Sequence, residues 1–84
     1  MLVWMLEIAS STNATPIEIT TATAHGLDTG MQVIVSGHLT NTPANGTWTI
    51  IKTAADKFTL TGSIGTGIGG ASGTVVKTQT PAIA

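Results

Sequence analysis

The 84-residue chain contains no cysteine and very few charged residues. Without cysteine it can form neither a disulfide nor a cysteine-ligated zinc site, so its fold must rest on packing or on contacts with neighbouring molecules. A chain this short supports one small domain with a thin core. Charged residues make up 8% of the sequence, against about 25% in a typical soluble domain. A surface so poor in charge indicates that much of it faces other protein subunits.

Positive charge is also scarce, since the chain has three lysines and no arginine. Nucleic-acid binding needs clustered basic side chains that neutralise phosphates, and Lys52, Lys57 and Lys77 form no such cluster. An anionic membrane surface is disfavoured for the same reason. The apolar run at residues 1–6 is too short to span a bilayer and lacks the basic region of a signal peptide. We therefore expect neither nucleic acid nor a membrane as a partner.

Groups that perform catalysis are few and are spread along the chain. The acids and histidines are Glu7, Glu18, Asp28, Asp56, His25 and His38. No two carboxylates lie at close spacing, no set of metal ligands is in register, and serine and threonine are too abundant to single out a nucleophile. The sequence therefore predicts no enzyme, no catalytic residue, no metal and no cofactor. For His25 we expect a structural role, a hydrogen bond that fixes the turn before Leu27.

Alternation of apolar and polar residues, interrupted by turn residues, is the dominant pattern of the sequence. It predicts strands over residues 2–8, 17–21, 32–36, 47–52 and 57–61 and a last strand centred on Val75 and Val76. Turns are expected at residues 10–13, 41–46 and 54–56. Trp48 is expected in the core because it alternates with Ile50. Short strands in this number protect their edges by closing, so we predict an all-β fold, a small five- to six-stranded barrel or sandwich with extended termini.

A single domain over residues 1–84 follows from this pattern. Residues 1–7 are expected to form an apolar N-terminal strand or arm, residues 8–78 the barrel, and residues 79–84 an extended tail. The glycine-rich segment 62–73 is interpreted as a long flexible loop. Residues 65–70 within it match the GxGxxG pattern, but a strand is expected after them, where dinucleotide binding needs a helix.

Several of these segments, taken in order, resemble a known module. They are residues 13–21 (NATPIEITT), 25–30 (HGLDTG), 33–37 (VIVSG), 41–49 (NTPANGTWT) and 58–63 (FTLTGS). Their order and spacing resemble a module common in structural proteins of bacteriophage virions. That module is similar to the small β-barrel inserted in ubiquitin-activating enzymes, the first half-domain of their catalytic cysteine region. The resemblance implies a scaffold rather than an activity, since the inserted barrel is not itself catalytic and this chain has no cysteine.

Two departures from the module bear on the interpretation. Phage copies often form part of longer tail or fibre chains, whereas this chain begins at Met1 and ends soon after one copy, which favours a separate subunit added in many copies. The stretch from Gly30 to Gln32 also lacks the acid that often follows the glycine. The second departure leaves the predicted fold unchanged.

The resemblance, the single module and the low charge together predict a non-enzymatic virion structural protein. Our leading hypothesis is a capsid decoration (cement) protein of a tailed bacteriophage, made in the host cytoplasm and bound to the major capsid protein or other virion proteins at the capsid surface. A tail, neck or fibre component is the alternative, and a glycan-binding module that uses Trp4 is a second alternative. Small virion subunits commonly meet around a symmetry axis, so we expect a homo-oligomer, with a trimer as the first choice.

The two chain ends are the predicted partner-binding elements. The residues assigned to this role are Leu2, Val3, Trp4, Met5, Pro81 and Ile83. A strand that is apolar on both faces must be covered on both, and a barrel of this size covers only one, so Val3 and Met5 are expected to meet another subunit. The alternative is that residues 1–6 lie in the domain's own core.

Overall fold

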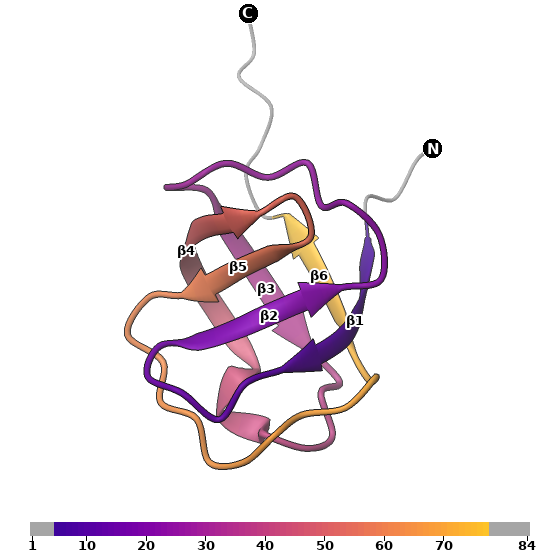
Figure 1. Ribbon diagram of the computed structural model, residues 1–84, viewed down its shortest axis with the longest axis vertical. Helices are drawn as coiled ribbons and strands as arrows, with labels where there is room; N and C mark the ends of the chain where they lie inside the picture. Colours follow the sequence, from indigo (N-terminus) through magenta and orange to yellow (C-terminus); the bar gives the residue numbers. More distant parts are fainter. Residues whose placement is uncertain (1–4, 78–84) are drawn as a thin grey trace, which may run out of the picture.

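Six antiparallel β-strands close into a barrel in the computed structural model, which describes residues 5–77 (Figure 1). The strands are β1 (Leu6–Ser11), β2 (Ile17–Thr21), β3 (Gln32–Ser36), β4 (Gly46–Ala54), β5 (Lys57–Leu60) and β6 (Thr74–Lys77). Around the barrel the order is β1-β2-β5-β4-β3-β6, and β6 pairs with β1 to complete the ring. A 3-10 turn, η1 (Thr42–Ala44), lies between β3 and β4. The prediction of a small all-β barrel is confirmed.

The interior of the barrel is filled by the apolar residues of the alternating strands. In β3, Val33 and Val35 are buried and their neighbours are exposed. In β5, Phe58 and Leu60 are buried and their neighbours in the strand are half-buried. The buried apolar residues are Ile8, Ile17, Ile19, Leu27, Val33, Val35, Ala44, Ile50, Phe58, Leu60 and Val75. Burial of each larger side chain contributes about 1.5–3 kcal/mol, so this cluster is the main source of stability.

Strand β4 is long because it belongs to both halves of the barrel. Residues 46–49 pair with β3, and residues 50–54 pair with β5. Trp48 lies in the first part, where it is half-buried and packs against the core. Its indole Nε1 donates a hydrogen bond to the carbonyl oxygen of Ala44, at 2.7 Å. The prediction that Trp48 is a core residue is therefore only partly right, since the side chain lies at the rim of the core and holds η1 in place.

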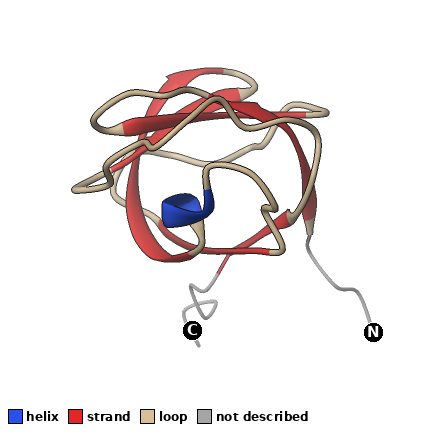
Figure 2. Cartoon of the chain, turned by 90° about the horizontal axis from the view of Figure 1, so that it is seen from below, coloured by secondary structure: helices blue, strands red, loops and turns tan. Residues whose placement is uncertain are grey.

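The barrel has two different ends. One, which we call the loop end, is formed by loops 12–16, 37–45 and 61–73 (bottom of Figure 1). The other, the terminal end, is formed by segments 22–31 and 55–56, where β1 also starts and β6 finishes. Figure 2 looks onto the loop end and shows η1 within the outline of the barrel. Ala44 of η1 is fully buried, so this turn covers the opening of the core.

The predicted turn at residues 10–13 is wrong in its first half. Ser10 and Ser11 belong to β1, where Ser10 pairs with Thr20 and Ser11 with Ile19. Serine is typical of turns, but here the backbone of Ser11 pairs on both sides and its hydroxyl is buried among polar partners. Tertiary contacts have overridden the local preference. Residues 2–4, the first half of the predicted first strand, lie outside the described residues, whereas Leu6 and Glu7 already pair with β6.

The segment predicted to be a long flexible loop is a loop, but hydrogen bonds attach it to the rest of the loop end. Ser11 and Gly69 exchange two backbone hydrogen bonds of 3.0 Å. The amide of Gly65 donates to the carbonyl oxygen of Ala14, at 2.9 Å. The segment therefore lies along β1 and the β1–β2 loop, and this contact positions the features described next.

Candidate functional site

The loop end carries no charged side chain. Loops 12–16, 37–45 and 61–73 contain only apolar residues, glycine, histidine and uncharged residues that bear a hydroxyl or an amide. The charged residues are Glu7, Glu18, Asp28, Lys52, Asp56, Lys57 and Lys77, and all lie in the strands or at the terminal end. The molecule is thus polarised, with its charge confined to the barrel wall and to one of its two ends.

Three large apolar side chains project from this uncharged surface. Leu39 is 78% exposed, Ile64 is 63% exposed and Ile68 is 80% exposed. Two hydrogen bonds place loops 37–45 and 61–73 side by side. The amide of Leu39 donates to Ser72 Oγ, at 3.0 Å, and the amide of Gly70 donates to Thr40 Oγ1, at 3.1 Å. Single exposed apolar residues are ordinary, but three on one end without any charge are typical of a surface that contacts another protein.

A buried polar cluster lies directly beneath this surface. Ser11, His38 and Asn41 are each at least nine-tenths buried. His38 Nδ1 lies 2.8 Å from the carbonyl oxygen of Ser72, which can only accept, so Nδ1 carries the ring proton. His38 Nε2 then accepts a hydrogen bond from the Ser11 hydroxyl, at 2.7 Å. Asn41 Nδ2 donates to Ser11 Oγ and to the carbonyl oxygen of Thr12, at 2.9 and 3.0 Å.

The contact between Ser11 and His38 has the geometry of a nucleophile and its base, and its surroundings decide what it does. Gly69 lies so close that a Cβ atom there would overlap both Ser11 Oγ and His38 Nε2. The backbone of Gly69 therefore occupies the space from which a substrate would approach. The third partner of the ring is a backbone carbonyl and not a carboxylate. This arrangement serves to hold β1, the β3–β4 loop and segment 61–73 together.

The described part of the chain holds neither a cluster of metal ligands nor an unpaired buried polar side-chain atom. Within residues 5–77 there is no group of three acidic, histidine or cysteine side chains that could hold a metal ion. Every buried side-chain nitrogen and oxygen in that range has a hydrogen-bond partner. Inside the described barrel, therefore, no buried side-chain polar group needs a ligand to complete its hydrogen bonds.

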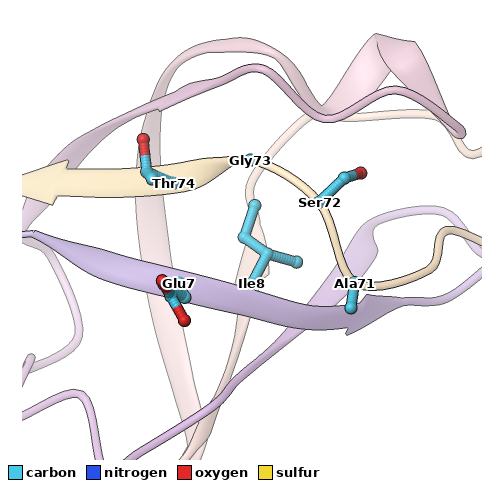
Figure 3. A pocket seen from close by; sticks show the side chains of 6 residues that line it. All are labelled: Glu7, Ile8, Ala71, Ser72, Gly73 and Thr74. Carbon is cyan, nitrogen blue, oxygen red and sulfur yellow. The ribbon is translucent and has the colours of Figure 1, made fainter.

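An open depression of about 330 Å³ lies at the seam between β1 and the start of β6 (Figure 3). Its lining consists of Glu7, Ile8, Ala71, Ser72, Gly73 and Thr74. The depression forms because β1 separates from the segment that precedes β6. The amide of Ile8 donates to the carbonyl oxygen of Gly73, at 3.2 Å, and the next backbone contact between the two is that of Ser11 with Gly69. Its polar groups are the carboxylate of Glu7 and the hydroxyls of Ser72 and Thr74, and such a shallow, open site with one charged group does not define a ligand.

His25 has the structural role that the sequence predicts. Its Nδ1 accepts a hydrogen bond from the amide of Leu27, at 2.9 Å, and so fixes the turn. Its Nε2 donates to the carbonyl oxygens of Ala54 and Lys57, at 2.9 and 3.0 Å. The ring is buried and meets the ring of Phe58 edge-on, with centroids 5.3 Å apart. The prediction for His25 is confirmed.

Most of the predicted partner-binding residues lie outside the described range, namely Leu2, Val3, Trp4, Pro81 and Ile83. Met5 is described, is 55% exposed, and precedes β1 at the terminal end. Leu39, Ile64 and Ile68 are not among the residues that the sequence predicted to bind a partner. Their signal is present in the sequence, since each is a large apolar residue within a segment rich in glycine, threonine and asparagine.

Comparison with known proteins gave no match to any family model or to any curated protein. Within residues 5–77 the structure contains no helix with the length and apolar character needed to cross a membrane.

Proposed function

We propose that the protein is a non-enzymatic structural protein of a tailed-phage virion and that it acts as a capsid decoration (cement) protein. The observation that carries this proposal is the uneven distribution of charge on the barrel: an uncharged loop end with three exposed apolar side chains lies opposite the end where β1 starts and β6 finishes. A cement protein has to hold neighbouring subunits together, and a small body with a contact surface at each end meets that requirement. The virion setting comes from the resemblance in the sequence.

The closed ring of strands restricts how partners bind. Because every strand within residues 5–77 pairs on both sides, the described barrel offers no full-length strand edge to which another chain could add a strand. Contacts must instead be made by side chains, by loops and by the segments that flank the barrel. Burial of Leu39, Ile64 and Ile68 would contribute on the order of 5 kcal/mol before the cost of association is subtracted.

We assign contact with the major capsid protein to the segments that flank the barrel. The residues concerned are Leu2, Val3, Trp4, Met5, Pro81 and Ile83. Residues 1–6 are apolar, and no charged side chain occurs before Glu7 or after Lys77. Each copy would bridge adjacent capsid subunits and oppose their separation, and many weak contacts acting together would reinforce the shell.

Quantitative mass spectrometry of purified particles tests this function. We expect on the order of hundreds of copies per particle, because a decoration protein repeats with the many subunits of the shell, and loss of the protein should lower the temperature at which heads release DNA. A count of about a dozen or fewer would instead place the protein in the neck, tail or fibre. Particles that lack the protein but keep full resistance to heat and low salt would overturn the cement role.

A further inference from the structure

We infer that the loop end is a self-association surface, on which identical copies of this chain meet around a symmetry axis. The inference rests on the proposed function in one respect: on the capsid, self-association would join several bound barrels into one unit. The surface consists of loops 12–16, 37–45 and 61–73, with Leu39 and Ile68 as its most exposed apolar residues.

The distribution of charge favours an identical copy as the occupant. In a symmetric contact the same patch is contributed by each subunit, so a charged residue near the axis meets its own copy and repels it. The barrel wall and the terminal end carry all the acids and lysines, whereas the loop end has none. The loop end is therefore the face on which identical copies approach without bringing like charges together.

The polar groups of the loop end are suited to bonding with copies of themselves. Exposed threonines and an asparagine lie around the apolar residues, at Thr12, Asn13, Thr15, Thr40 and Thr66. Hydroxyl and amide side chains carry both a donor and an acceptor, whereas a lysine only donates and a carboxylate only accepts. A surface of this kind can hydrogen-bond to an identical surface with every group matched.

The loops are also fixed before any partner arrives. The buried cluster of Ser11, His38 and Asn41 joins the loops to β1, and Asn41 Oδ1 accepts the amide of Thr66 at 3.0 Å. Trp48 holds η1 through its indole hydrogen bond. Little conformational entropy remains to be lost on association, which favours a stable contact from a small surface.

The full chain in solution, without any virion component, provides the test. Sedimentation velocity over about 1–500 µM should show a species of two or three protomers. Because the contact lacks charge, its dissociation constant should change less than about twofold between low and high salt. Ile68→Asp and Leu39→Asp place a charge at the axis and should each raise the dissociation constant at least about tenfold.

Ile51→Asp is the matched control, since Ile51 is 46% exposed on the barrel wall, in β4 and away from the loop end. It should leave association unchanged. All three variants replace exposed side chains, so circular dichroism should show the wild-type fold. A chain that stays monomeric at the highest concentration overturns the inference, as does association that Ile51→Asp abolishes and Ile68→Asp does not. Neither result bears on capsid binding, which is measured separately on stripped heads.

Discussion

Replacement of Gly69 by alanine tests the packing that underlies the loop end. The Cβ atom would overlap the hydroxyl of Ser11 and Nε2 of His38, two groups that are already in contact with each other. Neither can move freely, because Ser11 also receives a hydrogen bond from Asn41 and the His38 ring is held by the carbonyl of Ser72. The extra atom therefore strains the packing of the loop and also breaks the hydrogen bond between Ser11 and His38.

Each response has a cost that can be estimated. Overpacking of a close contact costs about 1–3 kcal/mol, and a buried polar group left without a partner costs a further 1–3 kcal/mol or so. We expect Gly69→Ala to lower the free energy of unfolding by about 2–6 kcal/mol. A domain of this length has a total of roughly 4–13 kcal/mol, so the change is a large fraction of its stability.

Gly70→Ala is the matched control, one residue further along the same loop. Nothing lies within 4 Å of a Cβ atom at Gly70, and neither Gly69 nor Gly70 has a positive φ. The control should be neutral or stabilising by about 0.4–1 kcal/mol, because alanine restricts the unfolded chain. Thermal unfolding followed by circular dichroism should separate the two variants by at least about 10 °C in Tm. Two variants within about 1 kcal/mol of each other would show that Gly69 does not lie against Ser11 and His38.

Three further predictions concern other parts of the barrel. His25→Ala leaves the amide of Leu27 and two carbonyl oxygens without their partner and creates a cavity. The free energy of unfolding measured in urea should therefore fall by about 2–4 kcal/mol, and a fall of less than about 1 kcal/mol would contradict the turn-fixing role. Trp48→Phe keeps one aromatic ring but removes part of the indole's packing and its hydrogen bond to Ala44, and should cost at least about 1 kcal/mol in the same assay, whereas an unchanged midpoint would mean that this bond does not hold η1. Deletion of residues 1–5 should leave the circular dichroism spectrum of the barrel intact, since β1 starts at Leu6, and should abolish rebinding to stripped heads; full rebinding would move the capsid contact away from the N-terminal segment.

The sequence predicted the local elements well because alternation is a local property. β3 covers the predicted residues 32–36, and β5 and β6 lie where Phe58 and Val75 alternate with polar neighbours. His25 could be assigned to its turn because Leu27, one of its partners, is two residues away. The loop end was harder to predict, because Leu39 and Ile68 lie in loops, where no alternation marks a side chain as exposed. The assignment of the chain ends as contact elements stays a prediction.

Composition and periodicity by themselves determined that this chain forms short strands around an apolar interior, because each residue's preference for one face of a strand is set by its own side chain. Only the tertiary structure decided that β6 closes on β1, that Ser11 belongs to a strand, and that three loops remote in sequence form one uncharged end. Ser11 and His38 are 27 residues apart, and no local pattern specifies which partner a buried serine will meet. That choice is made by the strand order of the barrel, which brings distant segments together once their apolar faces have been buried.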